Sequence, residues 1–170
     1  VYYLDKTPLE KVFKENKIDV VIHLAALYGR LGETPCQIAK VNLLFPLEVL
    51  QNAAKYGVKT FINTDTILSA QLNPYALTKA QFAQWLSFYA VKIQAVNLRL
   101  DHFYGPFDNP IKFIAFVFEQ IKKRAKQINL TEGSQTRDFI YIDDVISAYL
   151  CILENLDEIP SGKFNNFEAA

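Results

Sequence analysis

A tyrosine and a lysine four residues apart, Tyr75 and Lys79, are the pair in this sequence best suited to acid–base chemistry. On a helix, this spacing places both side chains on one face. A phenol has an ordinary pKa of about 10, and a neighbouring ammonium lowers that pKa because it favours the phenolate. The pair could therefore act as a general acid or base near neutral pH. Because the spacing also arises by chance on helices, it needs support from the surrounding sequence.

Hydroxyl side chains stand upstream of this pair, where a predicted strand ends. The segment 63–66 reads NTDT and directly follows apolar residues of a strand predicted at 58–63. Active sites of open parallel sheets lie beyond the carboxyl ends of the strands. A threonine at this position can hydrogen-bond a substrate oxygen while Tyr75 moves its proton. The structural alternative is that Thr64, Asp65 and Thr66 cap the turn that follows.

Strand and helix patterns alternate along the whole chain. Apolar, β-branched runs predict strands, and helical periodicity with terminal signals predicts helices. The predicted strands cover residues 18–24, 58–63, 93–100 and 139–142, and the predicted helices cover 7–15, 34–57, 74–89 and 111–126, with a last one ending near 154. The run at 18–24 is continuous enough to predict a strand buried on both faces. Regular alternation of this kind predicts the α/β class, with a doubly wound parallel sheet covered by helices.

Several residues mark the ends and bends of the predicted helices. Thr7 is the expected N-cap of the first helix, and Thr34 followed by Pro35 starts the long second one. Gly57 is expected to close that helix from the left-handed conformation. Pro46 lies inside the same helix and is expected to kink it, because proline lacks the backbone N–H.

The sequence lacks the pattern for one part of a complete dinucleotide-binding fold. No G-x-G-x-x-G turn follows a first strand, and the sequence opens on a helix pattern at Val1 and stops abruptly at Ala170. The 170 residues also contain no methionine. We therefore expect a glycine-rich βαβ unit to precede Val1 in a longer polypeptide.

Composition excludes several other classes of protein. Lys plus Arg and Asp plus Glu both number 18, and this zero net charge argues against a nucleic-acid partner. No uncharged apolar stretch approaches the length of about 18 residues that a membrane span needs. Cys36, Cys151 and two histidines do not have the spacing of a metal site, so no metal is expected. The small number of cysteines favours a reducing, cytoplasmic compartment.

Five motifs, in the same order and on the same elements, resemble one known family. They are DVVIHLAA at 19–26, Asn42, Y-x-x-x-K at 75–79, LRLDHFYGP at 98–106 and GSQTRDFIYIDDV at 133–145. The chain thus resembles the extended short-chain dehydrogenase/reductases, the NAD-dependent epimerases and dehydratases of nucleotide sugars. The short loop before Tyr75 is most similar to that of 4-ketoreductases of the abequose and paratose synthase type. This resemblance implies a Rossmann-like fold.

The resemblance also implies a role for each matching residue. Tyr75 would be the catalytic acid or base, and Lys79 would bind the nicotinamide ribose and favour ionisation of Tyr75. The third catalytic group would be Thr66, from an ungapped count along the strand, or Thr64, from the T-D-E triplet of the family's dehydratases; Thr66 is preferred. The cofactor-binding residues would be Leu24, Ala25, Ala26, Asn42, Tyr75 and Lys79.

Asp65, His102 and Arg137 would contact the substrate, Arg137 through the nucleotide diphosphate. Two departures from the family pattern matter. In the T-D-E register Thr66 replaces the glutamate base of 4,6-dehydratases, which argues against that reaction, and His102 replaces an asparagine. His23, at the end of the predicted strand 18–24, is expected to be structural.

These implications lead to one preferred function. We expect an NAD- or NADP-dependent oxidoreductase or isomerase of carbohydrate biosynthesis that transfers hydride at C4 of a nucleotide sugar, guessed to be a CDP-sugar. A 4-ketoreductase is preferred, a 4-epimerase is the alternative, and a catalytically silent binding protein is a further possibility. Residues 1–106 would form the C-terminal half of the NAD(P)-binding domain. Residues 107–170 would form a partial substrate-binding region with one or two elements returning to the sheet. We expect a homodimer.

Overall fold

The computed structural model describes residues 8–169, and the contacts between these residues divide the chain into two units. The first unit comprises the chain up to Arg99 together with Asp157–Glu168, and the second is formed mainly by Leu100–Leu156. The chain therefore leaves the first unit after Arg99 and returns to it near its end.

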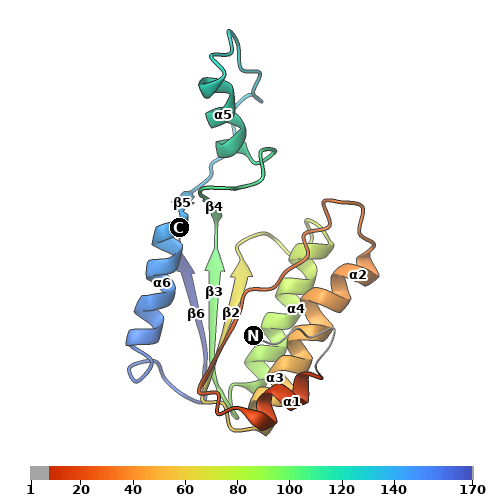
Figure 1. The fold of residues 1–170 in the computed structure, drawn as a ribbon, viewed down its shortest axis with the longest axis vertical. Helices are drawn as coiled ribbons and strands as arrows, with labels where there is room; N and C mark the ends of the chain where they lie inside the picture. The colour runs from red at the N-terminus through yellow and green to blue at the C-terminus, as the bar shows by residue number, and fades with distance from the viewer. Residues whose placement is uncertain (1–7, 170) are drawn as a thin grey trace. The chain divides into compact units, whose positions relative to one another are not determined.

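A four-stranded sheet is the centre of the first unit. Its strands are β1 (Val20–His23), β2 (Thr60–Thr66), β3 (Gln94–Leu100) and β6 (Phe164–Ala169), in the order β1-β2-β3-β6. β1 and β2 are parallel, with Val20 opposite Thr60 and His23 opposite Asn63. The arrowheads of β2, β3 and β6 point to the same end (Figure 1). The residues that follow these strands therefore gather at one edge, as the predicted parallel sheet requires.

Helices cover the sheet of the first unit. They are α1 (Leu9–Glu15), α2 (Pro35–Ala39), the π-helical turn η1 (Lys40–Leu44), α3 (Phe45–Lys55) and α4 (Pro74–Tyr89). In Figure 1 the labelled helices α1 to α4 lie on the same side of β2. Phe61 from β2, Leu50 from α3 and Phe82 from α4 are completely buried in the core between the two layers.

Two of the predicted helix ends are confirmed. Thr34 caps α2, where its hydroxyl accepts a hydrogen bond from Gln37 N, and Gly57 follows α3 with a φ of 73°. The predicted cap Thr7 lies outside the described residues. The structure has Pro8 at the N-cap of α1, without a side-chain hydrogen bond, because the helix begins only at Leu9.

The long second helix is interrupted just before Pro46. The backbone between Lys40 and Leu44 widens into a π-helical turn, and α3 restarts at Phe45. Pro46 then lies in the first turn of α3, where a missing N–H costs no helical hydrogen bond. The interruption falls beside the proline, as expected, and takes the form of a π turn.

The prediction that the first strand is buried on both faces was wrong. β1 has only His23 fully buried, and Ile22 is 39% exposed. Among the described residues β1 pairs only with β2, so it stands at the edge of the sheet. β2, in contrast, extends three residues further than predicted and includes Asp65 and Thr66.

The second unit contains a two-stranded parallel sheet and two helices. β4 (His102–Tyr104) pairs with β5 (Phe139–Tyr141), and the helices are α5 (Phe113–Lys122) and α6 (Ile142–Glu154). Gly105 follows β4 at a close approach, because an added Cβ would lie 2.6 Å from Ile142 Cγ2. β4 and β6 have no counterpart among the predicted strands.

None of the helices within residues 8–169 combines the length and apolar character required for a membrane crossing.

Candidate active site

The end of β2 and the start of α4 bring the predicted catalytic residues to one edge of the sheet. β2 ends at Thr66, and α4 begins at Pro74 after a short loop. Asn73 fixes the start of α4, because its Oδ1 accepts a hydrogen bond of 2.9 Å from Ala76 N. Tyr75 therefore lies in the first turn of α4, and the Thr66 side chain at the end of β2 is one of the groups that act on the pKa of its phenol.

Tyr75 is a buried phenol, with 9% of its surface exposed. Burial raises its pKa well above the ordinary value, and Tyr28 and Asp65 add to this rise, whereas the Thr66 side chain lowers the pKa. The sequence argument expected a lowered pKa from the neighbouring Lys79. That expectation was wrong for this structure, because the cost of burying a phenolate dominates and Lys79 is not among the groups that act most on this pKa. Tyr75 is consequently protonated at neutral pH.

Lys79 lies one helical turn after Tyr75 and is 2% exposed. Burial lowers its pKa to about 8, while the carboxylate of Asp65 opposes this change. A buried ammonium is costly unless acceptors surround it. The structure thus keeps a buried cation with three donor hydrogens one helical turn after Tyr75, and this cation still carries most of its charge at neutral pH.

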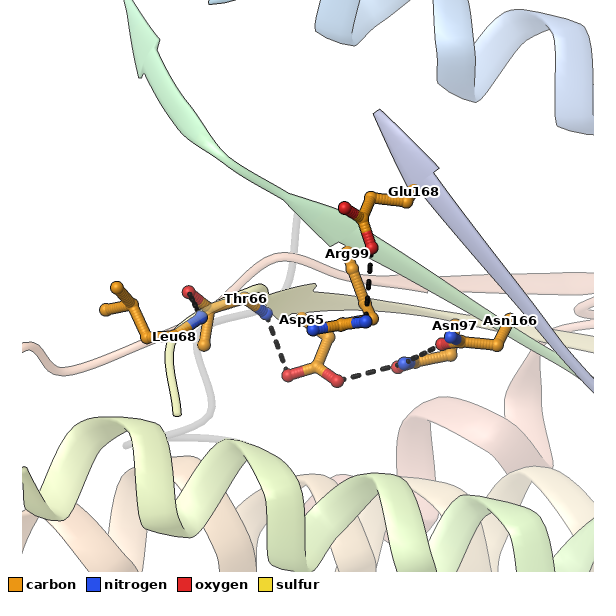
Figure 2. A network of polar contacts seen from close by, with 7 residues as sticks. All are labelled: Asp65, Thr66, Leu68, Asn97, Arg99, Asn166 and Glu168. Atoms are coloured by element: carbon orange, nitrogen blue, oxygen red, sulfur yellow. Dashed lines mark hydrogen bonds and ion pairs between the residues drawn. The ribbon is translucent and has the colours of Figure 1, made fainter. Parts of the chain in front are cut away.

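Asp65 is held by neighbouring donors at the end of β2 (Figure 2). Its carboxylate accepts hydrogen bonds of 2.8 Å from Thr66 N and 2.9 Å from Asn97 Nδ2. Asn97 also donates to Asn166 Oδ1 at 2.7 Å and accepts from Asn63 Nδ2 at 2.7 Å. This ladder of amides links three strands and fixes the carboxylate that faces Lys79.

A cavity of about 300 Å³ adjoins this network on the first unit. It is lined by Asp65, Thr66, Leu68, Ala76, Ala80, Ala83, Asn97, Arg99, Phe164 and Asn166. Arg99 on its wall pairs with Glu168 at 3.1 Å, as Figure 2 shows. The cavity therefore reaches the same strand ends as the predicted catalytic residues.

The predicted cofactor-binding residues lie in the segment after β1 and on the π turn. Leu24 to Ala26 follow His23, so the β1–β2 register places them beside the end of β2. Asn42 is buried, and its side-chain amide forms hydrogen bonds with both the N–H and the C=O of Leu27. Its Oδ1 accepts from Leu27 N at 2.7 Å, and its Nδ2 donates to Leu27 O at 2.8 Å.

His23 is packed among the aromatic rings of Phe45, Phe61 and Phe82. Burial, followed by the charge of Lys79, lowers its pKa to about 4. Its buried Nε2 atom has no hydrogen-bond partner within the described part of the chain. His23 is thus a neutral core residue at neutral pH, in keeping with the structural role expected for it.

His102 and Arg137, the other predicted substrate contacts, belong to the second unit. The His102 imidazole pairs with the neighbouring Asp101 carboxylate, and Arg137 is exposed on a segment without regular secondary structure. The other predicted site residues belong to the first unit, and the roles of all of them remain predictions.

Sequence reasoning missed one residue that contacts Tyr75. Tyr28, in the loop after β1, stacks on the Tyr75 ring with 4.7 Å between ring centroids and 27° between planes. The available signal was a Tyr-Gly pair soon after a strand end, at the edge where the other site residues were expected. Nothing in its spacing predicts the stacking partner.

Comparison with known proteins identifies relatives over nearly the whole chain. The family model described as the NAD dependent epimerase/dehydratase family matches residues 1–167. CDP-abequose synthase of Salmonella typhimurium is 38% identical over an alignment of 165 positions that covers 90% of this chain and 55% of that protein. UDP-glucuronate 4-epimerase of Thermodesulfobacterium geofontis is 31% identical over an alignment of 183 positions that covers 91% of this chain and 55% of that protein.

Solved structures show the same likeness. The UDP-glucuronic acid 4-epimerase of Bacillus cereus in complex with NAD superimposes with a TM-score of 0.81 at 26% identity, covering 99% of this chain and 58% of that one. The predicted Rossmann-like fold is thereby confirmed. The chain spans about half the length of the curated relatives it matches. Since the family model matches almost every residue, the chain belongs to the NAD-dependent epimerase/dehydratase family of nucleotide-sugar enzymes.

Proposed function

We propose that this chain carries the proton-transfer centre of an NAD(P)-dependent 4-ketoreductase that acts on a CDP-linked 4-keto-6-deoxy sugar. One observation carries the proposal. Tyr75 is a buried, protonated phenol near the end of β2, where Thr66 acts on its pKa, and Lys79 lies one helical turn further along α4. Such a group is equipped to donate a proton to a carbonyl oxygen as that oxygen becomes a hydroxyl.

The first unit has residues that fit the nicotinamide end of a dinucleotide. The buried ammonium of Lys79 has three donor hydrogens, and ribose hydroxyls are acceptors that would satisfy them. Leu24, Ala25 and Ala26 provide a small, apolar backbone segment at the same edge, and Asn42 fixes the residue that follows it. When bound, such a cofactor exchanges a hydride with C4 of the sugar.

In the proposed reduction the residues of this chain handle the proton. As C4 gains the hydride, the two electrons of the carbonyl π bond move to O4, and O4 takes the proton from Tyr75. Thr66 hydrogen-bonds O4 and keeps it within reach of the phenol, so it is the preferred third member over Thr64. The nearby Lys79 ammonium stabilises the phenolate that remains until a solvent proton restores it. Arg137 would hold the substrate diphosphate.

Two observations favour reduction over 4-epimerisation. Because its pKa is raised, Tyr75 is protonated at neutral pH, and a ketone reductase needs a proton donor when the carbonyl is reduced. CDP-abequose synthase is also the relative with the higher identity of the two described above. Because several relatives are 4-epimerases, 4-epimerisation is the second candidate function. The presence of both Tyr75 and Lys79 argues against a catalytically silent binding protein.

The two activities differ in their cofactor balance. The complete encoded polypeptide would be incubated with a CDP-4-keto-6-deoxy sugar and NADH or NADPH. A ketoreductase oxidises one equivalent of reduced cofactor for each 4-hydroxy sugar formed. An epimerase interconverts 4-hydroxy sugars without net change in cofactor. Epimerisation of a CDP- or UDP-hexose at C4 without net consumption of cofactor would therefore contradict the preferred function.

Replacement of the phenol hydroxyl tests the assigned centre. Tyr75→Phe is expected to reduce turnover by about 10²–10⁴-fold, because general acid–base groups contribute in that range. Tyr56→Phe is the matched control, since Tyr56 stacks on Phe13 in the same unit, away from the strand ends. Unchanged turnover in Tyr75→Phe, with the control also unchanged, would show that Tyr75 is structural.

We also propose that the chain forms a homodimer through the outer face of α4. Leu77, Trp85 and Phe88 are 45%, 44% and 69% exposed, and their spacing places them along one side of the helix. Exposed apolar patches of this kind mark association sites. Analytical ultracentrifugation should show a dimer for the wild type and a monomer for Phe88→Glu, with Gln51→Glu at an exposed position of α3 as the control. A monomeric wild type would contradict the proposal.

A further inference from the structure

Tyr28 makes the closest ring contact of Tyr75 among the described residues. The two rings are nearly parallel, with 4.7 Å between their centroids. Burial is the main reason that the pKa of Tyr75 is raised, and Tyr28 adds to this rise. The Tyr28 ring therefore lies against the phenol that is the proposed proton donor.

The loop that carries Tyr28 is held firmly on both sides of this residue. Before it, the side chain of Asn42 binds the N–H and C=O of Leu27 at 2.7 and 2.8 Å. After it, Gly29 has a φ of +75°, and a Cβ at this position would lie 2.7 Å from Ile38 Cδ1. Only glycine makes this close left-handed turn without strain. The backbone thus fixes where the Tyr28 ring can lie.

We propose that Tyr28 is a positioning residue for the proton transfer at Tyr75. Its ring restricts the rotation of the phenol and covers one face of it from water. This role rests on the proposed function of Tyr75 as the acid. It assigns to Tyr28 no bond-making step, because the proton that leaves in the reaction belongs to Tyr75.

The arrangement predicts how the titration of Tyr75 responds to changes at Tyr28. The groups that act on the pKa of Tyr75 are Tyr28 from the loop and Asp65 and Thr66 from β2, and Lys79 lies one turn further along the same helix. Of these, Tyr28 and Asp65 raise the pKa of Tyr75. Tyr28→Phe removes the hydroxyl that contributes to this rise and should lower that pKa. Tyr28→Leu also exposes the ring to water and should lower it further.

The first experiment uses the 170-residue chain with isotope-labelled tyrosine and follows ring ionisation by NMR. The Tyr75 signal is assigned by its loss in Tyr75→Phe. It should remain protonated to a higher pH in the wild type than in Tyr28→Phe, and to a higher pH there than in Tyr28→Leu. Tyr56→Phe, which removes the hydroxyl of another stacked tyrosine, should leave the Tyr75 signal unchanged. Identical ionisation of Tyr75 in the wild type and both Tyr28 variants would overturn the proposal.

The second experiment measures turnover of the complete polypeptide with the CDP-4-keto-6-deoxy sugar and NADPH. Tyr28→Leu should lower kcat by up to about 100-fold, because misplacing a reacting group by about an ångström costs that much, while KM changes little. A raised KM with unchanged kcat would make Tyr28 a substrate contact and overturn the positioning role. The NMR result does not depend on turnover, so a failure of the proposed function is recognised separately, by full activity of Tyr75→Phe.

Discussion

Helices α4 and α5 are both rich in apolar residues, yet they bury very different amounts of them. α4 buries residues along its whole length, including the polar Tyr75 and Lys79. In α5, all of which the structure describes, no residue is buried, and Phe118 is 63% exposed. The groups proposed to move protons thus lie on a packed helix, where their pKa values are set by burial. The unit that carries α5 instead presents exposed groups, among them Arg137, the proposed contact of the substrate diphosphate.

The largest expected effect lies in the core beneath the site. Phe82 is completely buried between α4 and β2, beside Phe61 and His23. Phe82→Ala should lower the free energy of unfolding by about 3–5 kcal/mol, because a cavity replaces the ring. Urea denaturation of the 170-residue chain measures this. A loss below about 1 kcal/mol would mean that α4 is not held by this core.

His23 should make stability depend on pH. Its pKa in the folded chain is about 4, below the ordinary 6.5, so the unfolded chain takes up a proton first as the pH falls. Its contribution is complete above pH 6.5 and declines toward pH 4, by at most about 3 kcal/mol. His23→Gln cannot titrate in this range and should flatten the pH dependence of the free energy of unfolding. Parallel curves for the wild type and His23→Gln would contradict the assigned burial.

The amide ladder beside the cavity should contribute less. Asn97 is 1% exposed and bonds Asp65, Asn63 and Asn166. Asn97→Ala leaves these groups without their partner and should cost about 1–3 kcal/mol of stability. Asn129→Ala, at an exposed site, is the control. If thermal unfolding of both variants is the same, the ladder does not support the strand ends.

The smallest effect is expected in α5. Phe118→Ala should change the free energy of unfolding by no more than about 0.5 kcal/mol, because its exposed ring has little packing to lose. A change comparable to that of Phe82→Ala would show that α5 is packed in solution. It would also remove the contrast between the two helices.

The packed region was also the easier one to predict from sequence. α4 begins at Pro74 and ends at Tyr89, as predicted, because proline at N1 and helical periodicity both act locally. β6 was missed because its segment 164–169 is polar and pairs with β3 across some seventy residues, as the Asn165–Ala95 hydrogen bond shows. Local sequence patterns do not indicate which distant strand a segment will pair with.

The candidate site likewise has one part that the sequence predicts and one part that it does not. The sequence predicts that Thr66, Tyr75 and Lys79 approach one another, since strand ends and helix starts meet at one edge of a parallel sheet. It does not predict that Tyr28 covers Tyr75, nor that burial outweighs the lysine charge. Both depend on how completely water is excluded, which follows from the packing of distant segments.

The π turn at Lys40–Leu44 has a consequence for how this sequence tolerates length changes. A π turn contains one residue more than an α-helical turn, and successive residues of an α-helix are rotated by about 100° around the helix axis. Losing any one residue here would restore a regular α-helix and rotate Asn42 relative to α3. The backbone of Leu27 would then lose both of its hydrogen bonds to Asn42. Insertions and deletions in this segment should therefore be rarer among functional descendants than substitutions, because a single gap would release the loop that covers Tyr75.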